Sequence, residues 1–336
     1  MRWEWTKETL ERLHRFLRQH DLVTGELQTR KIGDGHSNLT YLVGDGEREV
    51  ILRRPPPPPL PPGAHDVLRE ARLIQALTGT VVVPVPKVLA VGEKGMVLDV
   101  PFYIMEYVPG VVITDETPQF LSSPKDRRRL AEALIDHLAD LHAIDWRRLG
   151  LENFGRAEGF NHRHLRRIAE LLVDKNDSPL PEFKEIQEWL EAHVPEESGA
   201  SIIHNDYRLG NVMWASSSPA TLLAILDWEL ATIGDPLLDV GYFLASCPQP
   251  NEPRTPTQDF ARAMLEPGYP TRMELAQRYA TRAGKNLSNI AWYIAMCEWK
   301  LAVLFEYSRR RGEDAYYDDP NLVRRFLASA QKAAGI

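Results

Sequence analysis

The stretch SIIHNDYRLGNVMW, residues 201–214, places His204, Asp206 and Asn211 in a short polar loop between two apolar runs. A second carboxylate, Asp227, follows another apolar run at residues 222–226. Runs of this length are typical of buried strands. Strands that end at one edge bring two carboxylates and an amide together. Such an oxygen-rich set can bind a divalent cation, and one of its carboxylates can act as a proton acceptor.

The composition limits the classes of protein that the chain can represent. Its 336 residues are 26% charged and 43% hydrophobic, as in ordinary globular proteins, and the net charge of -7 argues against a general nucleic-acid binder. Cys247 and Cys297 form neither a zinc-type spacing nor a disulfide framework, which favours a reducing compartment. Without a signal-peptide pattern or a run of about 18 apolar residues, we expect a soluble, cytoplasmic protein with no membrane partner.

The first part of the chain predicts a small β-rich unit. Apolar residues at helical spacing predict a helix over 6–20, and two Gly-Asp-Gly turns predict a three-stranded antiparallel meander over 27–52. A helix over 64–77 and strands over 88–91 and 101–107 follow. The proline run 55–62 predicts a stiff connector, with a ligand for an SH3-like partner as the alternative.

The rest of the chain predicts a mostly helical unit. Pro109-Gly110 ends the last strand and marks the only clear boundary. We therefore predict an α+β chain with domains 1–107 and 108–336. Helices are expected over 124–142, 162–173, 181–194, 273–283, 287–309 and 321–334. Asp235 followed by Pro236 is a further helix-start signal, in which Asp caps and Pro takes the first helical position.

The spacing His204-x-Asp206-x-x-x-x-Asn211, with Asp227 at a later strand end, resembles the catalytic and metal loops of protein-kinase-like enzymes. His-Asn-Asp together with Asp-Trp-Glu is similar to the aminoglycoside phosphotransferase and choline kinase branch. The run 225–241 more closely resembles the phosphotransferase domain fused to some acyl-CoA dehydrogenases. The resemblance covers residues 27–310. It implies a bilobal fold with a five-stranded antiparallel N-lobe, one main N-lobe helix and a larger helical C-lobe.

The resemblance also implies chemistry with ATP and Mg²⁺. Asp206 would accept or orient the proton of an acceptor hydroxyl, and Asn211 and Asp227 would hold the metal. His204 is expected to brace the loop by hydrogen bonding. Arg208 is expected to reach either a phosphate or solvent.

The first turn of the meander can bring backbone N–H groups to phosphate oxygens, although many such turns are merely tight. Its candidate cofactor-binding residues are Gly33, Gly35, His36, Ser37 and Asn38.

In kinase-like enzymes a lysine on the third strand grips the phosphates, but this chain has Arg53 and Arg54 there. We favour Arg53, which shares a strand face with Ile51, and expect Glu70 to pair with it from the polar face of its helix. The alternatives are a solvated strand end and an exposed glutamate. Glu106 and Val108 would offer backbone groups to an adenine edge from the hinge over 105–110.

Three more residues have expected structural roles. Asp235 is expected to cap its helix, and the resemblance assigns Asp239 to tying this helix to the catalytic loop. His142 is expected to be a structural histidine rather than a metal ligand.

The resemblance implies that the phosphoryl acceptor is a hydroxyl of a small molecule, and the sequence leaves the identity of that molecule open. The dehydrogenase-linked resemblance favours a hydroxyacyl compound, with an aminoglycoside or a choline-like amine as alternatives. A nucleotide-binding regulatory pseudokinase and a metallohydrolase that uses His204, Asp206 and Asp227 also remain. Late-helix residues Trp292, Glu298, Trp299, Tyr307 and Arg309-Arg-Arg311 are expected either in the core or along the acceptor pocket. The oligomeric state stays open.

Overall fold

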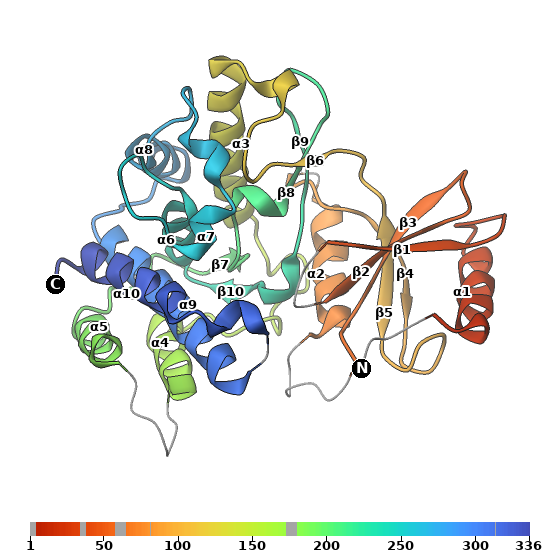
Figure 1. The fold of residues 1–336 in the computed structure, drawn as a ribbon, viewed down its shortest axis with the longest axis horizontal. Helices are drawn as coiled ribbons and strands as arrows, with labels where there is room; N and C mark the ends of the chain where they lie inside the picture. Colours follow the sequence, from red (N-terminus) through yellow and green to blue (C-terminus); the bar gives the residue numbers. More distant parts are fainter. Residues whose placement is uncertain (1–4, 34–37, 58–64, 81, 173–179, 313) are drawn as a thin grey trace. The chain divides into compact units, whose positions relative to one another are not determined.

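The computed structural model describes residues 5–33, 38–57, 65–80, 82–172, 180–312 and 314–336. The chain forms two compact units (Figure 1). The first comprises Met1–Pro109 together with Leu223–Glu229, and the second comprises Gly110–Leu222 together with Leu230–Ile336. The short segment that carries Asp227 therefore belongs to the first unit, although more than a hundred residues of the second unit precede it.

The first unit contains a five-stranded antiparallel sheet in the order β1-β2-β3-β5-β4, which confirms the predicted strands. Strands β1, β2 and β3 form the expected meander. The strands are β1 Gln28–Ile32, β2 Leu39–Gly44, β3 Glu49–Arg54, β4 Val88–Gly92 and β5 Phe102–Glu106.

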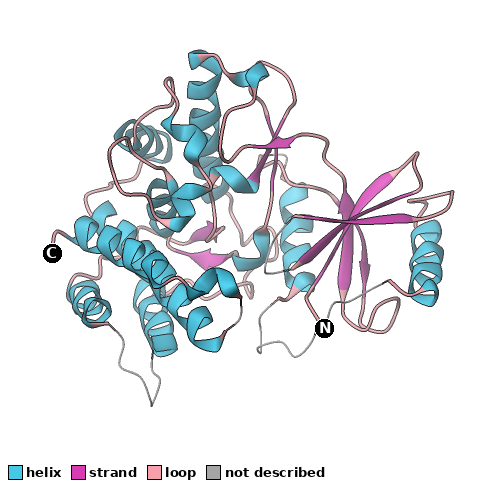
Figure 2. Cartoon of the chain, in the orientation of Figure 1, coloured by secondary structure: helices cyan, strands magenta, loops and turns pink. Residues whose placement is uncertain are grey.

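One helix covers each face of this sheet (Figures 1 and 2). Helix α1, Lys7–Gln19, begins after Thr6, whose hydroxyl accepts a hydrogen bond from the Thr9 amide. Its Leu13, Phe16 and Leu17 pack into a cluster with alternate residues of the strands, among them Leu52. Helix α2, Val67–Thr78, contacts β4 and β5. Because strand side chains alternate between faces, Arg53 lies on the opposite face of β3 from Leu52.

The second unit is mostly helical, with only short strands between its helices (Figure 2). Helix α9 packs against both α6 and α10. The helices are α3 Pro124–His142, α4 Phe160–Ala169, α5 Pro181–Ala192, α6 Pro236–Ser246, α7 Pro256–Asp259, α8 Arg272–Ala283, α9 Ile290–Arg311 and α10 Pro320–Ala334. The strands of this region are β6 Val111–Val112, β7 Ser201–Ile203, β8 Val212–Trp214, β9 Leu222–Ile225, which leads into the first unit, and β10 Thr232–Gly234.

Helix α6 begins as the sequence predicts and lies close against α9. The Asp235 side chain accepts from the Leu237 amide, and Pro236 occupies the first turn. A Cβ at Gly241 would lie 2.7 Å from Cβ of Tyr293 on α9, so the helices can approach this closely because glycine lacks a side chain. Among the described helices, none has both the length and the apolar character that crossing a membrane requires.

Candidate active site

The loop after β7 is fixed to α6 through its backbone. Asp239 on α6 is fully buried, and its carboxylate accepts hydrogen bonds from the amides of His204 at 2.5 Å and Asn205 at 2.7 Å. Asn205 has a φ of +67°, a left-handed conformation that Asn tolerates better than most residues. The predicted role of Asp239, tying its helix to this loop, is confirmed.

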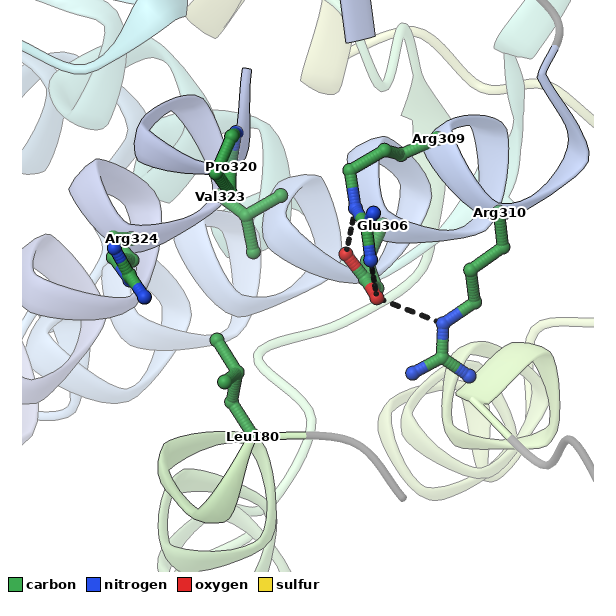
Figure 3. A pocket seen from close by; sticks show the side chains of 7 residues that line it. All are labelled: Leu180, Glu306, Arg309, Arg310, Pro320, Val323 and Arg324. Carbon is green, nitrogen blue, oxygen red and sulfur yellow. Dashed lines mark hydrogen bonds and ion pairs between the residues drawn. The ribbon is translucent and has the colours of Figure 1, made fainter. Parts of the chain in front are cut away.

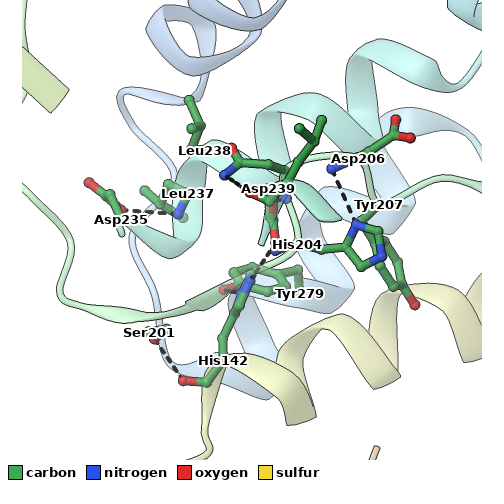
Figure 4. Close-up of polar contacts among 12 residues, drawn as sticks. His142, Ser201, His204, Asp206, Tyr207, Asp235, Leu237, Leu238, Asp239 and Tyr279 are labelled. Carbon is green, nitrogen blue, oxygen red and sulfur yellow. Dashed lines mark hydrogen bonds and ion pairs between the residues drawn. The ribbon is translucent and has the colours of Figure 1, made fainter. Parts of the chain in front are cut away.

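The two histidines near this loop are structural, as expected. His204 is fully buried, and its Nδ1 accepts from the Asp206 amide at 3.3 Å, so it braces the loop from within. His142 lies beneath the loop, with Nδ1 2.7 Å from the Tyr279 hydroxyl and Nε2 3.4 Å from Asp239 (Figure 4). Burial opposes ionisation of Asp239, but hydrogen bonds and charge from His142 keep its pKa below the ordinary value.

The Asp206 carboxylate is held by three side chains of the second unit. Its Oδ1 accepts from the Tyr242 hydroxyl and from Nε of Arg208 at 3.3 Å. Its Oδ2 accepts from Nδ2 of Asn211 at 2.7 Å, and the same nitrogen donates to the Asp206 carbonyl at 2.8 Å. The side chain is one-fifth exposed. The loop after β7 thus positions an accessible carboxylate with defined orientation.

The motifs of the sequence do not point to Tyr242. It lies three residues after Asp239, so both side chains project from the same face of α6 toward the loop. Burial raises the pKa of Tyr242 well above its usual range, and the nearby Asp206 carboxylate raises it further. The phenol therefore stays protonated and acts as a donor. The helical spacing of Asp239 and Tyr242 could have indicated from the sequence that Tyr242 faces the same loop as Asp239.

A second polar cluster lies in the first unit. Nε of Arg53 donates to Glu70 on α2 at 3.1 Å, and Nη2 donates to Oδ1 of Asp227. The preference for Arg53 over Arg54 agrees with this geometry, because Nε of Arg54 instead donates to the Pro55 carbonyl. The expected pairing of Glu70 with Arg53 is confirmed, although Glu70 lies on a buried surface of α2 and not on an exposed polar face. Only 2% of Glu70 is exposed, because the surface of α2 that carries it faces the cluster.

Glu70 is the centre of this cluster. Nδ2 of Asn38 lies 3.4 Å from Oε2 of Glu70, and the hydroxyl of Tyr103 on β5 also donates to this carboxylate. Burial raises the pKa of Glu70, while the Arg53 charge opposes that increase. The Asn38 side chain thus points toward Glu70, the carboxylate that pairs with Arg53.

Asp227 stands at a constrained turn. Its φ is +66°, and its side chain is one-third exposed. The turn is anchored on both sides, since the Ile225 amide donates to the Pro84 carbonyl at 2.8 Å and Nε1 of buried Trp228 donates to the Ile225 carbonyl at 2.9 Å. A strained backbone held by its surroundings is common at functional sites.

The nucleotide-binding predictions for the turn and the hinge remain predictions. Gly33 has a φ of +75°, which favours glycine, whereas Gly35, His36 and Ser37 lie outside the described residues. The Glu106 amide donates to the Lys87 carbonyl at 2.9 Å, so it is occupied within the sheet. The Glu106 carbonyl and the Val108 backbone are the groups we still assign to an adenine edge.

The late helix is mainly core. Trp292 and Trp299 are buried, and Glu298 is 1% exposed. Arg309 and Arg310 both pair with Glu306, beside a pocket of about 250 Å³ (Figure 3). The pocket is lined by Leu180, Glu306, Arg309, Arg310, Pro320, Val323 and Arg324. This lining contains no residue of the loop that carries Asp206.

The donor chemistry of the two candidate metal ligands fits Mg²⁺. Asn211 uses its amide nitrogen toward Asp206, so its side-chain carbonyl oxygen can serve as a ligand. Asp227 uses Oδ1 toward Arg53 and retains Oδ2. Both would offer the hard oxygen that Mg²⁺ prefers. Within the described part of the chain, no group of three or more His, Cys, Asp or Glu side chains is arranged to hold a metal ion.

A model of the phosphotransferase enzyme family, APH, matches residues 28–275. This chain belongs to that family. The phosphotransferase is 30% identical over 284 residues to mouse acyl-CoA dehydrogenase family member 10, a match that covers 84% of this chain. The matched region spans only 26% of that relative's length.

Solved structures agree with the family. A crystal structure from Ralstonia eutropha, provisionally described as an aminoglycoside phosphotransferase, has 27% sequence identity and a TM-score of 0.79, and the match covers 97% of this chain and 98% of that one. The aminoglycoside phosphotransferase APH(4)-Ia, in a mutant form solved with ADP and hygromycin B, has 13% identity and a TM-score of 0.61 over 95% of this chain and 97% of that one. The phosphotransferase therefore has the predicted α+β, protein-kinase-like fold.

Proposed function

We propose that this phosphotransferase moves the γ-phosphoryl group of ATP to a hydroxyl of a small molecule. The observation that carries the proposal is the Asp206 carboxylate, which three donors orient while one-fifth of its side chain stays exposed. A carboxylate in this state can accept a hydroxyl proton. Its use of a nucleotide is supported by the family and by the solved relative that holds ADP.

In the proposed reaction the acceptor oxygen forms a bond to the γ-phosphorus. The bond between that phosphorus and the bridging β–γ oxygen breaks, and ADP leaves with the electron pair. The acceptor proton passes to Asp206. Mg²⁺, held by Asn211 and Asp227, would offset the phosphate charge when bound. Arg53, fixed by Glu70, would contact the phosphates in the role that lysine has in related kinases.

We propose a hydroxyacyl compound as the acceptor, because the match to acyl-CoA dehydrogenase family member 10 covers most of this chain. An aminoglycoside is the second candidate, since a solved relative holds hygromycin B. Acceptor-dependent ADP release should be measured with 4-hydroxyacyl-CoA thioesters and with aminoglycosides under the same conditions. Turnover with an aminoglycoside and none with the thioesters would overturn our preference.

Two variants test the assigned roles. Asp206→Asn should lower turnover by about 10²- to 10⁴-fold and leave Mg·ATP binding intact, because the amide cannot accept the proton. Asp227→Ala should abolish metal-dependent ATP binding in calorimetry. A near-normal rate in Asp206→Asn, or unchanged Mg·ATP affinity in Asp227→Ala, would contradict the corresponding assignment.

A further inference from the structure

Tyr242 on α6 contacts Asp206 but has no role in the reaction proposed above. The Tyr242 hydroxyl donates to Oδ1 of Asp206, and Tyr242 is only 5% exposed. Lys300 on α9 also contacts the Tyr242 ring, with its Nζ 5.2 Å from the ring centroid. Lys300 is also 5% exposed. A buried cation over an aromatic ring is a favourable contact that restricts the ring.

Tyr242 and Asp239 together make α6 the frame for the catalytic loop. Asp239 fixes the backbone at residues 204 and 205, and Tyr242 fixes the side chain of Asp206. The loop backbone and the Asp206 carboxylate are thus oriented by the same helix. Because α6 is wholly buried and packs against α9, its position is set by the core of the unit.

The hydrogen bonds to Asp206 differ between its two oxygens. An ionised carboxylate has about four lone-pair positions, two on each oxygen. Oδ1 accepts from Tyr242 and from Arg208, which fills both of its positions. Among the described residues, Oδ2 accepts from Asn211 alone, which leaves one position for another donor.

We propose that Tyr242 is a positioning residue that, with Arg208, occupies Oδ1 of Asp206 and thereby reserves Oδ2 for the proton of the acceptor hydroxyl. This inference rests on the proposed function, because it takes Asp206 as the proton acceptor. Removing the phenol would let the carboxylate rotate away from the direction in which the acceptor approaches. Misplacement of a reacting group lowers the rate more than it lowers affinity for the nucleotide.

The kinetic test uses Tyr242→Phe and Mg·ATP with water as the acceptor, measured as ADP release. We expect kcat to fall about ten- to hundredfold with an unchanged Kd for Mg·ATP. Tyr269→Phe is the control. The Tyr269 hydroxyl lies 2.9 Å from Oγ1 of Thr117, and no hydrogen bond among the described residues joins it to Asp206. Its kcat should stay near that of the wild type. A normal kcat in Tyr242→Phe would overturn the proposal.

A double-mutant cycle separates positioning from general damage to the fold. In the Asp206→Asn background, Tyr242→Phe should cause no further loss, because its effect passes through the carboxylate. A further tenfold loss would overturn the inference. A separate outcome, wild-type turnover in Asp206→Asn alone, would instead refute the proposed function.

A crystal structure with ADP, Mg²⁺ and vanadate tests the choice of oxygen without turnover. The apical vanadate oxygen, which stands for the attacking hydroxyl, should lie within hydrogen-bond distance of Oδ2 of Asp206. In crystals of Tyr242→Phe the carboxylate should be rotated relative to the wild type. An apical oxygen bound to Oδ1, or an unmoved carboxylate in the variant, would refute the proposal.

Discussion

Arg53 and Asp227 form an ion pair across 174 positions of sequence. Nη2 of Arg53 donates to Asp227, and Nε of the same guanidinium donates to Glu70. A single cation therefore serves two carboxylates in the first unit. Only 11% of the Arg53 side chain is exposed, so these pairs are shielded from the solvent that weakens surface ion pairs.

Replacement of Arg53 by lysine should destabilise the protein. The lysine ammonium is a single point charge and cannot reproduce two donors of a planar guanidinium. We expect Arg53→Lys to lower the free energy of unfolding by about 1–3 kcal/mol, since one partly buried carboxylate loses its partner. Urea denaturation followed by circular dichroism measures the change.

Arg128 supplies the matched control for this substitution. It also bridges two carboxylates, Glu132 and Glu274, but its side chain is 49% exposed. Arg128→Lys should leave the free energy of unfolding nearly unchanged, because solvent already screens an exposed ion pair. Equal effects of the two substitutions would show that burial of the Arg53 cluster contributes nothing to stability.

Asp239→Asn should weaken both the fold and the catalytic loop. The carboxylate accepts from two backbone amides, whereas an amide side chain keeps one acceptor oxygen and turns a donor toward the other amide. We expect a loss of about 2–4 kcal/mol in the free energy of unfolding and a lower rate of ADP release. Asp145→Asn, at an exposed ion pair with Arg148, should leave both nearly unchanged. Wild-type stability of Asp239→Asn would contradict the assigned role of Asp239.

Glu298 should make stability depend on pH. Burial raises its pKa to about 8, and its Oε1 accepts from Ser329 at 3.0 Å. The folded protein therefore keeps a proton on Glu298 that the unfolded chain releases near pH 4.5. The contribution of Glu298 to the free energy of unfolding is fully present below pH 4.5. It is lost as pH rises toward 8, by about 1.4 kcal/mol per pH unit.

Glu298→Gln removes this titration. Urea denaturation at pH 5, 6, 7 and 8 should give a smaller decrease in stability for Glu298→Gln than for the wild type. The glutamine oxygen can still accept from Ser329, so the variant should fold. Parallel pH dependences for the two proteins would rule out titration of Glu298 in this range.

Both cysteines should be unreactive in the folded protein. Cys247 and Cys297 are 1% and 0% exposed, and burial raises the pKa of each thiol to about 12. The reactive thiolate is therefore scarce as well as inaccessible. At pH 8, Ellman's reagent should modify neither cysteine within minutes, and both should react at once in denaturant. Rapid reaction of one thiol in native protein would contradict its buried position.

The sequence by itself determined the strands, most of the helices and the set of polar residues in the loop after β7. Period-two alternation placed Arg53 and Arg54 on opposite faces of β3, and Asp-Pro at 235–236 marked the start of α6. These features are local, because a strand or helix periodicity fixes which residues share a face. The family resemblance added the role of Asp239, which the structure confirms.

Only the tertiary structure decided which distant residues meet. The pair of Glu70 with Arg53 was expected, but only packing buries Glu70 and brings Asn38 and Tyr103 to the same carboxylate. The bond from Tyr242 to Asp206 depends on the position of α6 beneath the loop, 36 residues further along the chain. Periodicity defines the face of an element, but the partner across that face is set by how the elements pack, which no local pattern contains.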